Sequence, residues 1–121
     1  MTDTVTPTQP SLDTAALREF VERKWNDEIL HALTDYIAVP AKSPGFDADW
    51  VRNGYIDRVV RDAAQWAERQ PVKGLKLEVI RLEGRTPVIF FEAPATRSGS
   101  SETIVLYGHL DKQPEFDGWR K

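Results

Sequence analysis

His109 and Asp111 are the two residues whose types and spacing point most directly to chemistry. In an extended segment, residues two apart point to the same side of the chain. The Asp111 carboxylate is then placed to accept a hydrogen bond from one imidazole nitrogen of His109, which leaves the other nitrogen for a metal ion. A His-x-Asp sequence taken alone also fits a hydrogen-bonded surface histidine that binds no metal. Both interpretations stay open on the pair alone.

The residues before this pair predict a buried strand. Residues 103–107 read Thr-Ile-Val-Leu-Tyr, and an unbroken apolar run is typical of a strand that is covered on both faces. Open α/β sheets bind their ligands just past the carboxyl ends of such strands. Gly108 would allow a sharp backbone turn at this point. The pattern therefore places His109 and Asp111 where a site is expected.

Upstream, the hydrophobic periodicity predicts two amphipathic helices followed by a β-hairpin. Capping residues and prolines mark the limits of the helices: Asp13 or Thr14 and Pro40 for the first, Asp47 or Asp49 and Pro71 for the second. Residues 75–79 then alternate between apolar and charged side chains, and residues 88–91 form a second apolar run. Because the connection between these runs is too short for a parallel crossover, they are predicted to pair as a hairpin.

Composition limits the classes of partner and site. The chain has 121 residues, enough for one small domain, and its 16 Lys and Arg against 19 Asp and Glu give a net charge of −3. This charge has the wrong sign for a protein that neutralises phosphates, so nucleic acid is not an expected partner. With no cysteine and only two histidines, any metal must be held by His and carboxylates. Neither a secretory signal nor an apolar stretch of about 18 residues is present, so a cytoplasmic location without a membrane partner is predicted.

The chain is expected to divide into a short lead and one incomplete domain. Residues 1–12 are rich in Thr, Pro, Ser and Gln and are predicted to be flexible. Residues 13–121 supply two helices and three strands of an α/β fold, which would leave the buried third strand without a cover on one side. We therefore expect further chain after Lys121.

Two segments resemble a known family. Residues 104–114 read Ile-Val-Leu-Tyr-Gly-His-Leu-Asp-Lys-Gln-Pro and are followed by Asp117-Gly118-Trp119. They closely resemble the first metal-binding motif of the zinc metallopeptidase family that contains carnosinase, cytosolic nonspecific dipeptidase, acetylornithine deacetylase and aminoacylase. Residues 36–43, Tyr-Ile-Ala-Val-Pro-Ala-Lys-Ser, resemble the family's Ile-x-x-Pro element, with Ala41 where serine is more usual. The resemblance covers roughly residues 15 to 121.

The resemblance implies a fold and a set of roles. The fold would be the N-terminal part of a three-layer α/β/α zinc-peptidase catalytic domain, with two helices, a β-hairpin and a buried strand that ends in the His-x-Asp motif. His109 would be a ligand to one of two zinc ions, and Asp111 would be the catalytic-site residue that orients it. Lys112 departs from the hydrophobic residue that is common in the family. The Asp117-Gly118-Trp119 segment would lie on the substrate side of the site.

The implied function is metal-assisted hydrolysis of dipeptides or N-acyl amino acids. In the family, the bridging aspartate, the general-base glutamate, the other metal ligands and a dimerisation domain lie downstream, and none has a counterpart in these residues. The 121 residues are therefore predicted to be an N-terminal fragment that is inactive as an isolated chain, with a homodimer expected for the full-length protein. The alternative is a non-catalytic, truncated α/β fragment that acts only as an interaction or vestigial module.

Overall fold

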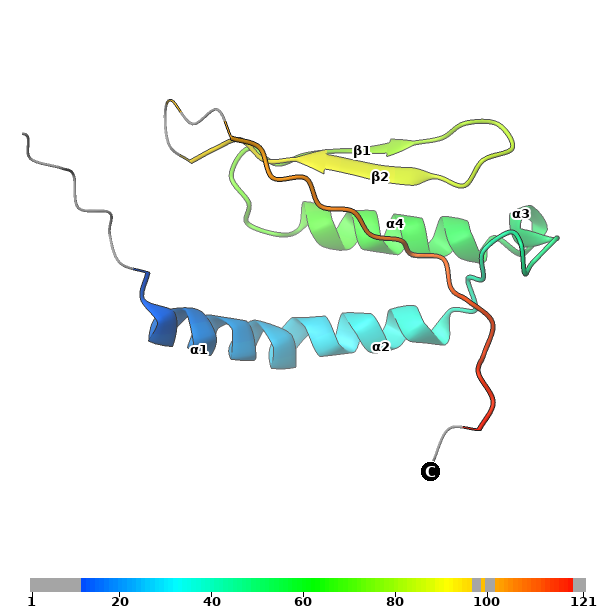
Figure 1. The fold of residues 1–121 in the computed structure, drawn as a ribbon, viewed down its shortest axis with the longest axis horizontal. Helices are drawn as coiled ribbons and strands as arrows, with labels where there is room; N and C mark the ends of the chain where they lie inside the picture. Colours follow the sequence, from blue (N-terminus) through cyan, green and yellow to red (C-terminus); the bar gives the residue numbers. More distant parts are fainter. Residues whose placement is uncertain (1–11, 97–98, 100–101, 119–121) are drawn as a thin grey trace, which may run out of the picture. The chain divides into compact units, whose positions relative to one another are not determined.

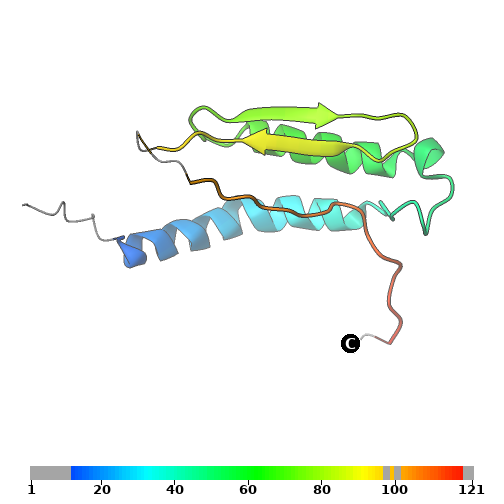
Figure 2. The same cartoon turned by 45° about the horizontal axis from the view of Figure 1, so that its top comes forward.

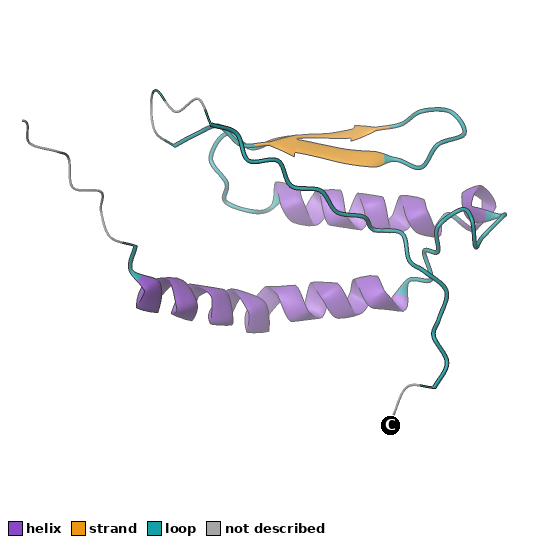
Figure 3. Ribbon diagram, in the orientation of Figure 1, coloured by secondary structure: helices purple, strands orange, loops and turns teal. Residues whose placement is uncertain are grey.

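The computed structural model describes residues 12–96, 99 and 102–118. Most of the predicted lead, residues 1–11, and Trp119 lie outside the described residues. The chain mixes helices with a two-stranded antiparallel sheet (Figures 1 and 3). It forms two compact units, Met1–Ile37 and Ala38–Lys121, which are considered separately below.

The first unit is built on one continuous helix, as predicted. It begins as α1 (Thr14–Lys24), passes through a π-helical turn, η1 (Trp25–Ile29), and continues as α2 (Leu30–Ala38). Asp13 provides the cap, because its carboxylate accepts hydrogen bonds from the backbone N–H groups of Ala15 at 3.1 Å and Ala16 at 3.0 Å. The π-helical turn was not predicted, since the apolar periodicity of the sequence runs through it without a break.

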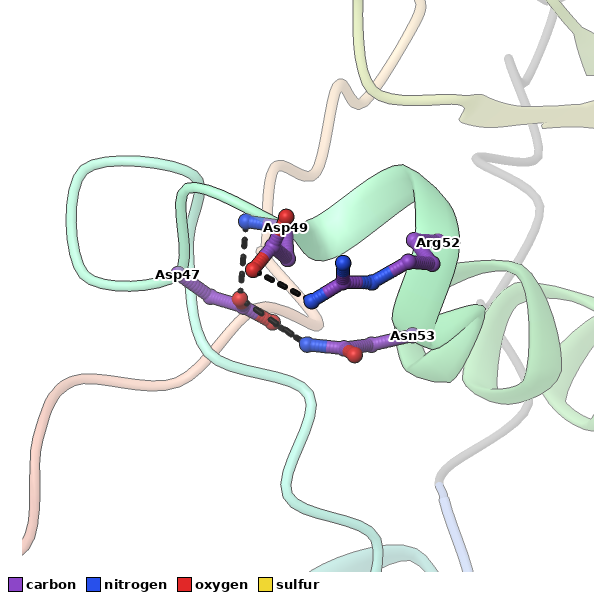
Figure 4. Close-up of polar contacts among 4 residues, drawn as sticks. All are labelled: Asp47, Asp49, Arg52 and Asn53. Atoms are coloured by element: carbon purple, nitrogen blue, oxygen red, sulfur yellow. Dashed lines mark hydrogen bonds and ion pairs between the residues drawn. The ribbon is translucent and has the colours of Figure 1, made fainter.

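The predicted second helix is two helices, α3 (Trp50–Asn53) and α4 (Tyr55–Glu68). The single-helix prediction is wrong at Gly54, which has a φ of +68° and so ends α3 in the left-handed conformation that glycine adopts most readily. The turn before α3 is held by Asp47 (Figure 4), whose carboxylate accepts from the Asp49 N–H at 3.1 Å and from the Asn53 amide at 3.0 Å. Asp49 occupies the N-cap position of α3 without a side-chain capping bond, and its carboxylate instead accepts from the Arg52 guanidinium at 2.7 Å.

The predicted hairpin is confirmed. Strands β1 (Lys76–Ile80) and β2 (Val88–Glu92) pair antiparallel, with Leu77 opposite Phe91 and Val79 opposite Ile89. Along β1, half-buried side chains alternate with exposed ones, as the alternation in the sequence predicts for a strand with one solvated face.

The core of the second unit lies around α4. The hairpin lies along α4 in both views (Figures 1 and 2), and α4 contacts both strands. The buried side chains come from α4 and from the segment just after α2: Ile56, Val59, Val60, Ala64, Val39 and Ala41. The segment around residues 39–41 is thus fixed in the same core as α4. No helix within the described ranges is long and apolar enough to cross a membrane.

The prediction of a buried third strand is wrong for this structure. Residues 102–111 contain no strand (Figure 3), and the side chains of residues 104–107 are between 85% and 92% exposed. A strand needs a hydrogen-bonding neighbour, and β2 pairs only with β1 within the described sheet. The zinc-peptidase architecture is therefore not shown, and the observed fold is a small mixed assembly of helices and one hairpin.

Candidate functional site

His109 and Asp111 lie against each other at the end of the extended segment. The Nδ1 atom of His109 is 2.9 Å from the backbone carbonyl oxygen of Asp111 and 3.3 Å from its carboxylate Oδ1. The side chain of His109 is 59% exposed and that of Asp111 is 35% exposed. The imidazole ring is thus held on one side by Asp111 while much of it remains accessible.

The surroundings of Nδ1 determine the tautomer of the neutral ring. A carbonyl oxygen and a carboxylate oxygen are both acceptors, so Nδ1 must carry the proton in order to donate to either of them. The neutral imidazole then has an unprotonated Nε2 with a lone pair. This is the form in which histidine binds a metal ion, with Nδ1–H fixed by a carbonyl or carboxylate oxygen.

The motif is attached to a distant part of the chain through Lys112. The Lys112 N–H donates to the Ala41 carbonyl at 2.8 Å, and the Ser43 N–H donates to the Lys112 carbonyl at 2.9 Å. These two hydrogen bonds form an isolated parallel bridge between Lys42 and Lys112. Because Ala41 is fully buried, at 0% exposure, the bridge attaches the motif to the core of the second unit.

Two lysine side chains reinforce this attachment. The Lys112 ammonium donates to the Val39 carbonyl, and burial lowers the pKa of Lys112 below its ordinary value. Lys42 forms an ion pair with Glu115 across the same two segments, with Nζ and Oε2 2.8 Å apart. The hydrogen bond from Lys42 lowers the pKa of the Glu115 carboxyl below its ordinary value, and the positive charge of Lys42 acts in the same direction.

Other features expected near the site are absent or lie elsewhere among the described residues. Gly108 has no positive φ, and a Cβ added to it would meet no neighbouring atom within 4 Å, so no sharp turn requires glycine there. His31, the other histidine, is exposed on α2 in the first unit. Asp117 is exposed, and the nearby Trp119 lies outside the described residues.

The donor set at His109 fits one ligand of a zinc site. Its free Nε2 and its fixed Nδ1–H match what a metal-binding histidine needs, whereas a catalytic zinc normally has three protein ligands. Across residues 12–96, 99 and 102–118, no three His, Asp or Glu side chains gather in a way that could hold a metal ion. The described residues therefore present one ligand and the group that orients it.

Sequence reasoning did not find the role of Lys112 in this arrangement. The only signal in the sequence was a charged residue at a position where the resembling family has a hydrophobic one, and that signal does not reveal a contact with Val39.

No known protein-family model matches this chain, and no curated protein matches it.

Proposed function

We propose that this chain carries the first metal-binding motif of a zinc-dependent metallopeptidase that hydrolyses dipeptides or N-acyl amino acids. The observation that carries the proposal is the orientation of His109, whose Nδ1 faces the carbonyl and carboxylate oxygens of Asp111. Further support comes from the bridge at Lys112, because it joins the two segments on which the family resemblance rests.

The proposed roles of the residues combine this geometry with the family resemblance. His109 would hold one zinc ion through Nε2, and Asp111 would keep the imidazole in the required tautomer and orientation. A bound zinc ion supplies Lewis acidity, which lowers the pKa of water and polarises a scissile carbonyl. The other ligands and the proton-transferring carboxylate are not gathered around His109 within the described residues. Catalysis by these 121 residues alone is therefore not expected.

The test is hydrolysis of a panel of dipeptides and N-acetyl amino acids by the protein isolated from its source, with its intact mass measured in parallel. We expect turnover that a chelator abolishes, that added zinc restores, and that His109→Ala lowers by at least about 100-fold, as removal of a metal ligand should. His31→Ala is the matched control and should leave turnover unchanged.

Two results would contradict parts of the proposal. Turnover that survives both the chelator and His109→Ala would exclude a role for His109 as a metal ligand. Chelator-sensitive turnover by a purified chain of 13.8 kDa would show that the site is complete within these residues.

The exposed run at residues 104–107 favours a second candidate, a non-catalytic interaction module. Four consecutive apolar side chains with exposures of 85% to 92% form an unusual surface for a protein that acts alone. This candidate predicts concentration-dependent association and no turnover in the native protein. Sedimentation velocity combined with the hydrolysis panel distinguishes the two functions. If the chain is an interaction module, Val105→Lys should abolish the association, and neither the wild type nor the variant should hydrolyse the panel.

A further inference from the structure

We propose that Lys112 is a positioning residue, which holds His109 in its metal-binding tautomer by fixing the peptide group between Asp111 and Lys112. Only the predicted effect on zinc affinity rests on the proposed function, because the His109 tautomer exists without metal. Lys112 touches neither zinc nor substrate in this account. It acts through Asp111.

One peptide group connects the backbone of Lys112 to the imidazole of His109. The Asp111 carbonyl and the Lys112 N–H belong to the same planar unit, and in a trans peptide they point in opposite directions. The Lys112 N–H donates to the Ala41 carbonyl at 2.8 Å, which is one of two restraints on the plane. The Asp111 carbonyl on the other side of that plane is the oxygen that lies 2.9 Å from Nδ1 of His109.

Lys112 is itself held by two further hydrogen bonds. Its carbonyl accepts from the Ser43 N–H at 2.9 Å, and its ammonium reaches back to the carbonyl of Val39. Val39 is buried and Ala41 is fully buried. Main chain and side chain of Lys112 are therefore attached to two points of the same packed segment, so Lys112 is restrained against rotation about its backbone.

Removal of the Lys112 ammonium leaves the Val39 carbonyl with a hydrogen-bond partner. The Val39 carbonyl also accepts the Ala41 N–H at 2.8 Å, so it keeps a hydrogen-bond partner when Lys112 is shortened or neutralised. A hydrophobic side chain of similar length in the half-buried position of Lys112 adds no unpaired polar group. Lys112→Met should therefore fold while losing the side-chain restraint on the peptide group.

The experiment compares imidazole tautomers by two-dimensional 1H–15N NMR of the metal-free protein at a pH where both histidines are neutral. These 121 residues contain two histidines, so two rings contribute signals when this chain is studied by itself, and His31 serves as the internal reference. In the wild type we expect His109 with its proton on Nδ1. In Lys112→Met the signals should shift toward the Nε2–H form, which free imidazole side chains prefer in water, and zinc affinity at His109 should fall about tenfold, as for other groups that orient a ligand.

Lys42→Met is the matched control. It removes a lysine ammonium that joins the same two segments through Glu115, 2.8 Å away, but that contact does not involve the Asp111 peptide group. Lys42→Met should therefore keep the Nδ1–H tautomer and the wild-type zinc affinity. A general loosening of the two segments would instead change the tautomer in both variants, which would overturn the specific role of Lys112.

The remaining outcomes are also decisive. The inference is overturned if Lys112→Met keeps the wild-type tautomer while its backbone amide spectrum shows that the protein is folded. If Lys112→Met does not fold, Lys112→Leu replaces it, because the leucine side chain likewise has no donor for the Val39 carbonyl, and the same shift is expected. If zinc fails to bind His109 in the wild type, the proposed function fails while the metal-free tautomers still decide the role of Lys112.

Discussion

At the scale of single residues, Glu115 makes the stability of the fold depend on pH. Its folded-state pKa is lowered, first by the hydrogen bond from Lys42, so its carboxylate stabilises the fold above the ordinary glutamate pKa. That contribution is lost as the pH falls through the lowered pKa. The difference in melting temperature between wild type and Glu115→Gln should be present at about pH 7 and diminish as the pH falls below the ordinary glutamate pKa of about 4.3.

A double-mutant cycle provides the control for this prediction. In a Lys42→Met background the ion pair at 2.8 Å is absent, so the pH-dependent effect of Glu115→Gln should shrink to the part that the backbone hydrogen bond of Glu115 supplies. The effect should also shrink in about 1 M salt, because the pair is exposed and salt screens it. A pH-dependent difference of undiminished size without Lys42 would contradict the role of the ion pair.

Gly54 is the residue at which backbone conformation decides a helix boundary. With a φ of +68°, it adopts a conformation that an alanine side chain disfavours by about 1–2 kcal/mol. Gly54→Ala should therefore lower the free energy of unfolding by about that amount. Gly45→Ala is the control, because Gly45 has open space around it and no positive φ. Urea unfolding of both variants checks the prediction, which fails if the two lose equal stability.

At the scale of elements, α4 is the helix that carries the packing. Ile56 on α4 is 4% exposed, whereas Ile104 in the extended segment is 87% exposed. Ile56→Ala should lower the free energy of unfolding by about 2–5 kcal/mol through lost burial and the cavity that remains. The same change at Ile104 should cost no more than about 0.5 kcal/mol. Equal losses in urea unfolding would show that residues 104–107 are buried in solution.

Elements whose signals are local were predicted well. The Asp13 cap, the continuous helix that follows it and the antiparallel hairpin all depend on neighbouring residues or on a short turn. The break at Gly54 was missed because a single glycine with positive φ does not disturb the apolar periodicity on either side. The prediction of a third strand was wrong for a different reason. An apolar run predicts that a segment can be buried, but a strand also requires a pairing partner, and the run does not contain one.

At the scale of the whole molecule, the sequence could predict the site only in part. The spacing of His109 and Asp111 was enough to predict which residues would meet, because residues two apart in an extended segment share a side. It could not predict that the Asp111 carbonyl would lie closer to Nδ1 than the carboxylate does. Nor could it predict the attachment through Lys112, since hydrogen bonds between positions about 70 residues apart leave no local pattern.

The central claim is that His109 is a metal ligand, and a zinc titration followed by imidazole 15N NMR tests it most directly. Because these 121 residues contain two histidines, each ring is observed separately when this chain is titrated by itself. The account predicts that Nε2 of His109 responds at lower zinc concentration than either nitrogen of His31, and that Asp111→Asn weakens this response by roughly 10–100-fold. Equal responses of the two histidines, or none from His109 at saturating zinc, would contradict the claim.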